Sequence, residues 1–145
     1  MFKETLKVAS SKTGNGVFAG TFIPANIPII EVTGKLHTNA DITDHPAILQ
    51  VGFDLFIGPS GDKDDYINHS CNPNCYLHIV GSRAIVYSLY DIQPGTEITF
   101  DYSTSSTDTL DKWQMECACG FGNCRKIISG LQYLCLLYTS DAADE

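Results

Sequence analysis

Short apolar runs separated by turn residues predict that this chain folds mainly into β-strands. Residues 29–32 form a β-rich run that Gly34 closes, and residues 48–51 and 55–57 flank the sequence Gly52-Phe53-Asp54. The second arrangement is typical of a β-hairpin. Signals for helices are weak along the whole chain, so we expect a mostly β fold.

Two further turns organise the second half of the chain. Residues 76–80 and 83–88 flank Gly81-Ser82, which predicts a hairpin with a two-residue loop. Pro94-Gly95 predicts another turn, and residues 97–102 should follow it as a strand.

The composition changes after this strand. Residues 104–109 are rich in Ser and Thr, have no apolar period and are typical of a linker, while residues 111–116 allow one helical turn. Cysteines gather from Cys117 onward. We therefore divide the chain into a core at residues 1–103 and a linker with a cysteine-rich segment at residues 104–134.

The last eleven residues, 135–145 (CLLYTSDAADE), have no turn chemistry and no apolar period that continues the domain. The string resembles the translation of a transposase adaptor used to make sequencing libraries, and such a segment would not belong to the fold. On this interpretation the native sequence is known only to Leu134. The alternative is an ordinary short tail.

Length and composition place the chain among globular proteins. Its 145 residues, 43% of them hydrophobic, suit one compact domain with its own core. No apolar run approaches the roughly 18 residues that suggest a membrane span, and Met1-Phe2-Lys3-Glu4 lacks the apolar stretch of a secretory signal. We expect an intracellular protein, in the cytoplasm or nucleus, where structural disulfides are rare. A monomer is compatible with this composition.

The formal net charge of −8 narrows the choice of partner. It disfavours direct binding of nucleic acid, because phosphates are contacted mainly by Lys and Arg. It favours a basic partner, such as a lysine-rich peptide, through electrostatic steering. The alternative is that the charge only keeps the protein soluble.

A metal site is predicted by residues 117–124 (CACGFGNC), which carry three thiols within eight residues. Structural zinc takes four thiolate or imidazole ligands in a tetrahedron, so a fourth must come from Cys71, Cys75 or a histidine. The alternatives are a catalytic zinc with an open position and a pair of disulfides. No neighbouring His-Glu pair suggests a zinc hydrolase, and the intracellular setting argues against disulfides. We therefore predict a structural zinc.

Three other motifs are weak when each is taken alone. Residues 68–75 (NHSCNPNC) are dense in polar groups, but a plain turn can use Asn-Pro-Asn and His69 fits a structural histidine. Residues 95–102 (GTEITFDY) fit a turn and a strand with packing aromatic residues. The Gly-x-Gly in residues 14–18 (GNGVF) is most often only a turn.

The order of the motifs is more informative than any one of them. Gly-x-Gly, Asn-His-Ser-Cys-x-Pro-Asn, Gly-x-Glu-(x)3-Asp-Tyr and Cys-x-Cys-(x)4-Cys follow one another as in SET-domain protein-lysine methyltransferases, and the chain resembles this family over residues 2–128. It is similar to a minimal member with a SET core and a post-SET cysteine cluster. The resemblance implies small curved sheets, a knot-like threading of a C-terminal strand, and S-adenosylmethionine as the cofactor.

The resemblance also implies roles for individual residues. Tyr102 matches the catalytic tyrosine, and Asp101 and Glu97 match supports for its strand and for the neighbouring loop. The positions that match the family's cofactor contacts are Gly14, Asn15, Gly16, Asn68, His69 and Tyr102. The implied zinc ligands are Cys71, Cys117, Cys119 and Cys124. Cys75 is then left as a free thiol.

Phe100 matches a position that in the family tends to hold phenylalanine or tyrosine. A tyrosine hydroxyl there can hold a water beside the reacting amine and limit the number of methyl groups added. Phenylalanine lacks the hydroxyl, so we expect addition of two or three methyl groups to one lysine. The alternative is that Phe100 is a core aromatic residue without influence on the product.

The chain departs from the family pattern in three places. Asp65 stands where arginine is common, and Thr96 stands where a first glutamate is common. The insert that helps to select the peptide is nearly absent from residues 41–65, and a second active-site tyrosine is not evident there.

The expected function is transfer of methyl groups from S-adenosylmethionine to lysine side chains of a protein substrate, such as a histone or another basic protein. One alternative is a SET fold that binds a peptide or cofactor without turnover. Another is a zinc-stabilised interaction protein that only resembles the family. A cofactor-binding measurement separates the last of these from the others, and a methylation assay separates the first two.

Overall fold

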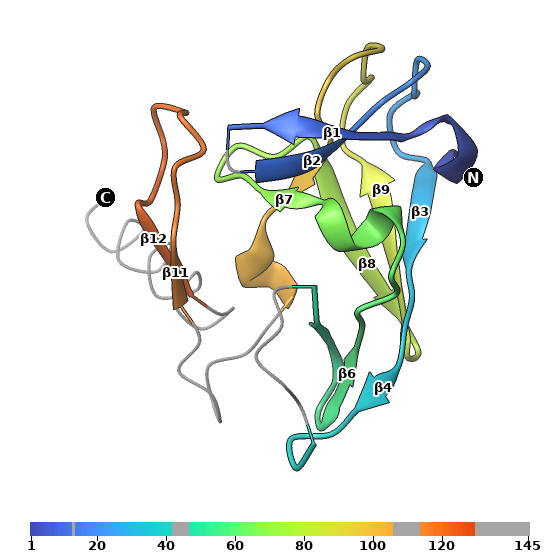
Figure 1. Ribbon diagram of the computed structural model, residues 1–145, viewed down its shortest axis with the longest axis vertical. Coiled ribbons are helices and arrows are strands. Elements are labelled where there is room, and N and C mark those ends of the chain that lie inside the picture. The colour runs from blue at the N-terminus through green and yellow to red at the C-terminus, as the bar shows by residue number, and fades with distance from the viewer. Residues whose placement is uncertain (13, 42–46, 106–113, 130–145) are drawn as a thin grey trace, which may run out of the picture.

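A computed structural model describes residues 1–12, 14–41, 47–105 and 114–129, and these residues form a mostly β fold (Figure 1). The strands are β1 (Lys7–Ser11), β2 (Gly14–Phe18), β3 (Pro28–Val32), β4 (Leu36–His37), β5 (Leu49–Gly52), β6 (Leu55–Ile57), β7 (Asn68–His69), β8 (Cys75–Val80), β9 (Arg83–Ser88), β10 (Thr99–Phe100), β11 (Gln114–Glu116) and β12 (Ile127–Ser129). The helices of the described residues are the short 3-10 turns η1 (Lys3–Thr5), η2 (Lys63–Tyr66) and η3 (Tyr102–Ser105). None of these helices is long and apolar enough to cross a membrane.

The strands form several small sheets, as the sequence predicts. One sheet has the order β3-β9-β8, another has the order β4-β6-β5, and the remaining strands pair as β1-β2, β7-β10 and β11-β12. Val80 pairs with Arg83, which confirms the two-residue Gly81-Ser82 loop, and Gly52 pairs with Leu55 in the predicted second hairpin. The expected threading of a C-terminal strand stays a prediction.

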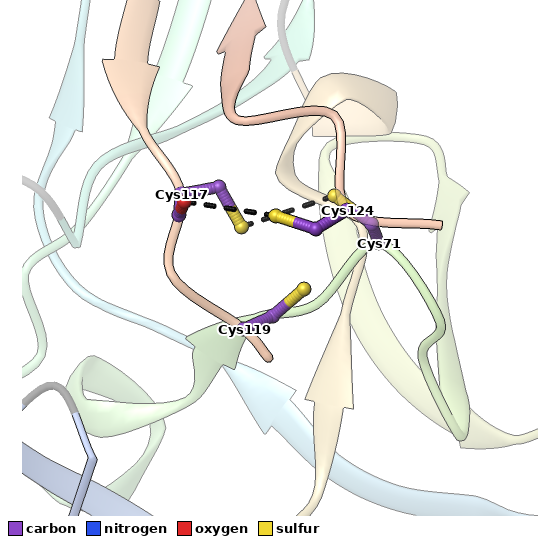
Figure 2. A group of neighbouring side chains, drawn as sticks. All are labelled: Cys71, Cys117, Cys119 and Cys124. Atoms are coloured by element: carbon purple, nitrogen blue, oxygen red, sulfur yellow. Dashed lines mark hydrogen bonds between the residues drawn. The ribbon is translucent and has the colours of Figure 1, made fainter. Parts of the chain in front are cut away.

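Residues 114–129, which we call the cysteine segment, form the β11-β12 hairpin at one side of the molecule (Figure 1). Its thiols face the loop after β7, as Figure 2 shows. The sequence prediction of a helical turn at residues 111–116 is wrong for Gln114–Glu116, which is strand β11. These residues satisfy their backbone groups by pairing with β12. Residues 111–113, most of the predicted linker and the adaptor-like tail lie outside the described residues.

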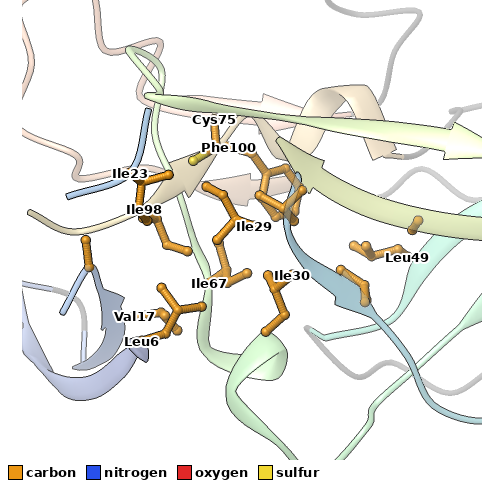
Figure 3. Close-up of a cluster of buried hydrophobic side chains, with 14 of the residues drawn as sticks. Leu6, Val17, Ile23, Ile29, Ile30, Leu49, Ile67, Cys75, Ile98 and Phe100 are labelled. Carbon is orange, nitrogen blue, oxygen red and sulfur yellow. The ribbon is translucent and has the colours of Figure 1, made fainter. Parts of the chain in front are cut away.

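The hydrophobic core lies between the small sheets (Figure 3). Ile29 and Ile30 of β3, Val86 of β9 and Val17 of β2 meet there with Ile98, and all five are almost fully buried. Burial of an aliphatic side chain of this size stabilises the fold by about 1.5–3 kcal/mol. Apolar packing therefore holds together strands that are individually only two to six residues long.

The strand predicted at residues 97–102 is much shorter in the structure. Only Thr99–Phe100 forms a strand, paired with β7, while Glu97 makes an isolated bridge to Phe18 of β2. The chain then turns into η3 at Tyr102, where the Asp101 carboxylate accepts the Ser103 N–H at 3.0 Å. Tyr102 therefore lies outside the strand that carries Phe100, contrary to the prediction of one strand over residues 97–102. Their rings still lie together, with centroids 5.1 Å apart.

Candidate functional site

Asn68 connects three segments that are far apart in the sequence. Strand β7, which carries it, pairs in parallel with β10, and this places Asn68 beside Thr99. The Asn68 Nδ2 donates to the Glu97 Oε2 at 2.8 Å, to the Asn15 carbonyl at 2.9 Å and to the Ser11 hydroxyl at 3.2 Å. The amide therefore fixes the β1-β2 hairpin against the segment that leads to Tyr102.

The two glycines of the Gly-x-Gly motif lie in different surroundings. Gly14 has a φ of +115°, a backbone conformation that side chains disfavour. At Gly16 an added Cβ would collide with the carboxylate of Glu97. The prediction that these residues form a turn needs correction, because both lie in strand β2, where Gly16 pairs with Ala9. The close approach of Glu97 to a bare backbone is nevertheless a feature of this site.

Tyr102 lies at the start of η3 with both of its polar groups engaged. Its hydroxyl donates to the Ile67 carbonyl and its N–H donates to the His69 Nδ1 at 3.0 Å. Burial raises the pKa of this phenol, and the nearby Glu97 carboxylate raises it further. The Tyr102 hydroxyl is therefore neutral at physiological pH, and it can orient a reacting group by hydrogen bonding.

His69 joins the Tyr102 turn to the cysteine cluster. Because its Nδ1 accepts the Tyr102 N–H, the proton of the neutral ring is on Nε2, which lies 3.3 Å from the Cys71 Sγ. Burial lowers the pKa of His69 to about 4, the Asp101 carboxylate opposes this shift and Arg125 adds to it. The 3.7 Å approach of His69 to Asp101 is therefore a contact of a neutral imidazole rather than an ion pair.

A small pocket opens beside Phe100 and Tyr102, and it is also lined by Ile67, Asp64 and Asp65. Phe100 is only 3% exposed and belongs to the hydrophobic core, so it contributes to both the core and the pocket. Burial raises the pKa of Asp64. The pocket thus combines aromatic walls with carboxylates.

Asp65, which stands where arginine is common in the family, has a structural task in this chain. Its carboxylate accepts the backbone N–H of Ser60 at 2.8 Å and of Gly61 at 2.7 Å. The loop before η2 is therefore held by an acidic side chain.

The four predicted zinc ligands converge in the structure (Figure 2). The Sγ atoms of Cys71, Cys117, Cys119 and Cys124 all lie within 4.8 Å of one another. A tetrahedron with Zn–S distances of about 2.3 Å has edges of about 3.8 Å, and the Cys71 and Cys117 sulfurs are 3.8 Å apart. The donor set therefore fits one tetrahedral zinc ion. Cys75, the fifth described cysteine, is buried in the core instead.

The protein environment affects the cluster thiols unequally. Burial raises the pKa of Cys117 to about 12 and also raises that of Cys71. For Cys119 burial acts in the same direction, but the N–H groups of Phe121 and Cys71 outweigh it and lower the pKa to about 6. Neighbouring thiolates repel one another, so a bound cation is needed for all four to lose their protons.

Sequence reasoning missed Arg125, which follows Cys124 directly. Its guanidinium donates to both carboxylate oxygens of Asp101, at 2.9 and 2.7 Å, and to the Ser103 hydroxyl at 3.1 Å. Its position beside a predicted ligand, in a chain with only nine basic residues, was the one available signal.

Comparison with protein families distinguishes a SET domain from an unrelated fold in which these motifs are plain turns and strands. The profile described as the SET domain matches residues 14–103. The chain belongs to the SET-domain family. This match contains the Gly-x-Gly strand, the Asn68-His69 pair and Tyr102, and it ends before the cysteine segment.

Relatives of this SET domain are named histone-lysine N-methyltransferases. TRX1 of Oryza sativa subsp. japonica is 28% identical over 151 residues, which cover 90% of this chain and 14% of that protein. SETD1B of Homo sapiens is 30% identical over 141 residues, which cover 85% of this chain and 7% of that protein. The chain therefore spans a small part of the length of the relatives it matches.

Solved structures show the same fold. A crystal structure of KRYPTONITE in complex with mCHG DNA and SAH matches with a TM-score of 0.70 and 30% identity, over 84% of this chain and 28% of that one. A second KRYPTONITE structure, with mCHH DNA, an H3(1–15) peptide and SAH, matches with a TM-score of 0.69 and 31% identity, over 84% and 29%.

Proposed function

We propose that this SET domain transfers methyl groups from S-adenosylmethionine to lysine side chains of a protein substrate. The observation that carries the proposal is the convergence of Gly16, Asn68 and Tyr102, which hydrogen bonds and close packing join into one site. The presence of SAH in both KRYPTONITE structures supports the choice of cofactor.

Gly14, Asn15 and Gly16 of β2, with Asn68 and His69 of β7, are the residues that would hold the cofactor. At Gly14 the space beside the backbone is open, whereas at Gly16 the Glu97 carboxylate fills it and would be a negative group near a cationic ligand. When bound, S-adenosylmethionine supplies a methyl group activated on a positively charged sulfur.

The chain's own contribution to catalysis is to orient and desolvate the lysine amine. A lysine with a pKa of about 10.4 costs roughly 4 kcal/mol to deprotonate near neutral pH. The rings of Phe100 and Tyr102 would exclude water from one side of the amine and so disfavour the ammonium form, while the carboxylates of Asp64 and Asp65 in the same pocket would act in the opposite direction. The Tyr102 hydroxyl would align the neutral amine, and alignment of this kind supplies several kcal/mol.

Cys71, Cys117, Cys119 and Cys124 would hold one structural zinc ion. A site with four protein thiolates is closed, so this ion would have no open position for a substrate. The zinc would therefore fix the cysteine segment against the loop that follows Asn68-His69, rather than take part in the reaction.

The substrate is proposed to be a basic, lysine-containing protein segment such as a histone tail. The names of the relatives, the H3 peptide in one KRYPTONITE structure and the acidic charge of this chain support this choice. A histone substrate would imply a nuclear location. Because both KRYPTONITE complexes also contain DNA, the comparisons do not support the expectation that nucleic acid is not a ligand.

The test is incubation of the chain with a lysine peptide library and isotope-labelled S-adenosylmethionine. We expect label in a subset of peptides and a parallel cofactor-binding signal by calorimetry. Cofactor binding without label in any peptide would favour a binding module over an enzyme.

Tyr102→Phe is the variant that tests the site itself. It removes one hydroxyl and keeps the packing ring, so cofactor binding should stay near the parent value while methyl transfer falls on the order of a hundredfold or more. Turnover of labelled peptide and cofactor calorimetry measure the two effects. A rate within about threefold of the parent would show that Tyr102 is not catalytic.

A further inference from the structure

Arg125 and Asp101 form a two-point ion pair between the cysteine segment and the start of η3. Both side chains are largely buried, with 13% and 14% of their surface exposed. Paired charges of this kind are costly to separate, because removal of one partner leaves the other uncompensated away from water. The two hydrogen bonds also fix the orientation of the guanidinium, because two of its N–H groups must face the same carboxylate.

At one end of this pair, the position of Arg125 depends on the cysteine cluster. Arg125 follows Cys124 directly, and its backbone N–H donates to the Cys71 Sγ at 3.3 Å. In the same region, the side chain of Asn123 donates to the Cys71 carbonyl at 3.0 Å. Whatever holds the four sulfurs together therefore also sets the place of the guanidinium.

At the other end, Asp101 shapes the turn that carries Tyr102. Its Oδ1 accepts the Ser103 N–H at 3.0 Å, and its carbonyl accepts the Thr104 N–H at 3.1 Å. Arg125 also reaches the Ser103 hydroxyl at 3.1 Å, and Ser103 is fully buried. A shift of Asp101 would therefore move the first turn of η3 and the Tyr102 ring with it.

We propose that Arg125 is a positioning residue that transmits the geometry of the cysteine cluster through Asp101 to the Tyr102 hydroxyl. The proposal rests on the methyl-transfer function proposed above. The cysteine segment would then have a second role, in positioning Tyr102, besides supplying metal ligands. Arg125 touches no reacting atom and acts on the η3 turn chiefly through Asp101, with the Ser103 hydroxyl as a second contact in the same turn.

The experiment compares three single variants of the full chain. Arg125→Met removes the positive charge and both hydrogen bonds to Asp101. Arg125→Lys keeps the charge but cannot make the two parallel hydrogen bonds of a guanidinium. The matched control is Arg83→Met, since Arg83 also pairs with a carboxylate, that of Glu31, but this pair is exposed at 59% and 28%. An exposed pair contributes little to stability.

Three quantities are measured for each variant: zinc per chain by elemental analysis, kcat and KM for a labelled peptide, and hydrogen exchange of the Tyr102 and Ser103 amides. For Arg125→Met we expect one zinc per chain, faster exchange at both amides, and a kcat lowered about 10- to 100-fold, as for other residues that orient a metal-linked site. Arg125→Lys should restore part of kcat, and Arg83→Met should match the parent in all three.

A double variant tests whether the two partners act together. If Arg125 acts through Asp101, Arg125→Met should have little further effect on kcat in an Asp101→Asn background, because the losses of coupled residues do not add. Additive losses would show that Arg125 acts by another route and would overturn the proposal.

Two more results would overturn it. One is an Arg125→Met kcat within about threefold of the Arg83→Met control with zinc retained. The other is loss of zinc from Arg125→Met with full recovery of kcat when zinc is resupplied, which would limit Arg125 to metal affinity. If the parent chain transfers no methyl group, the proposed function fails by itself. The exchange rates then decide, since unchanged Tyr102 and Ser103 exchange with zinc bound would refute the coupling.

Discussion

The hydrophobic core and the cysteine segment of this SET-domain chain are stable for different reasons. The core joins 17 buried residues from most of the sheets. In the cysteine segment, Ile128 is the one fully buried side chain among residues 115–128, for which burial is described. The segment contacts the rest of the molecule through hydrogen bonds to Cys71 and the Arg125–Asp101 pair, and its sulfurs converge with that of Cys71 at the proposed zinc site.

The two kinds of interaction also differ in how precisely they fix the positions of atoms. Apolar packing is non-directional, so its contribution depends on the area buried rather than on the angles of single contacts. Thiolate coordination and a two-point ion pair are directional, and they fix positions to within a fraction of an ångström. The catalytic Tyr102 proposed above lies between these two regions, since its ring contacts Phe100 of the core and its turn contacts the segment through Asp101.

Removal of the proposed zinc ion is the change that should separate the two regions most strongly. Structural zinc contributes about 10–16 kcal/mol of binding free energy in small metal-dependent domains, and the cysteine segment has little apolar burial to replace it. With a strong chelator, amides of the cysteine segment should exchange fast while those of β8 and β9 stay protected. Hydrogen exchange followed by mass spectrometry measures both. Chelator saturated with zinc is the control, and simultaneous loss of protection in both regions would refute the separation.

Cysteine substitutions test the same contrast with one residue type. Cys119→Ala removes one of four ligands and should abolish stable zinc binding, whereas Cys75→Ala should leave one zinc per chain. Burial raises the pKa of Cys75 to about 12, so its thiol stays protonated and packs as a small apolar group. Its loss should cost about 1 kcal/mol of unfolding free energy. Elemental analysis and thermal unfolding measure these effects, and zinc loss from Cys75→Ala would contradict them.

The elements that depend on neighbouring residues could be predicted from the sequence. The Gly81-Ser82 loop sits between two runs of suitable length, and the β8-β9 hairpin follows from local turn chemistry. The cysteine spacing likewise predicted a cluster, because three of the four thiols lie on one short segment. In both cases the residues that determine the structure are close together in the chain.

The elements that depend on distant partners could not be predicted. Strand β10 ends where its pairing with β7 ends, and η3 forms where the Asp101 carboxylate accepts the Ser103 N–H and His69 accepts the Tyr102 N–H. Arg125 reaches Asp101 across 24 positions, with no periodic pattern to mark the pair. Tertiary contacts therefore decided the details of the site, while local propensity decided the hairpins.

The last prediction concerns Phe100, the residue that belongs to both the core and the pocket beside Tyr102. We propose that its lack of a hydroxyl allows the enzyme to add two or three methyl groups to one lysine. The parent should therefore give di- or trimethyl-lysine peptide under excess cofactor, as measured by mass spectrometry. Phe100→Tyr should shift the product toward monomethyl-lysine, because a hydroxyl at this place can hold a water beside the amine.

The same substitution separates the two roles of Phe100. A hydroxyl buried without a partner costs about 1–3 kcal/mol, so a purely structural Phe100 would give a less stable variant with an unchanged product pattern. A pocket role would shift the product pattern with a smaller loss, since the hydroxyl would face the substrate channel and find water there. Leu77→Met, a volume-conserving change at a residue that packs on the core outside the pocket, is the control and should change neither. A parent enzyme that stops at one methyl group would show that the assignment of Phe100 is wrong.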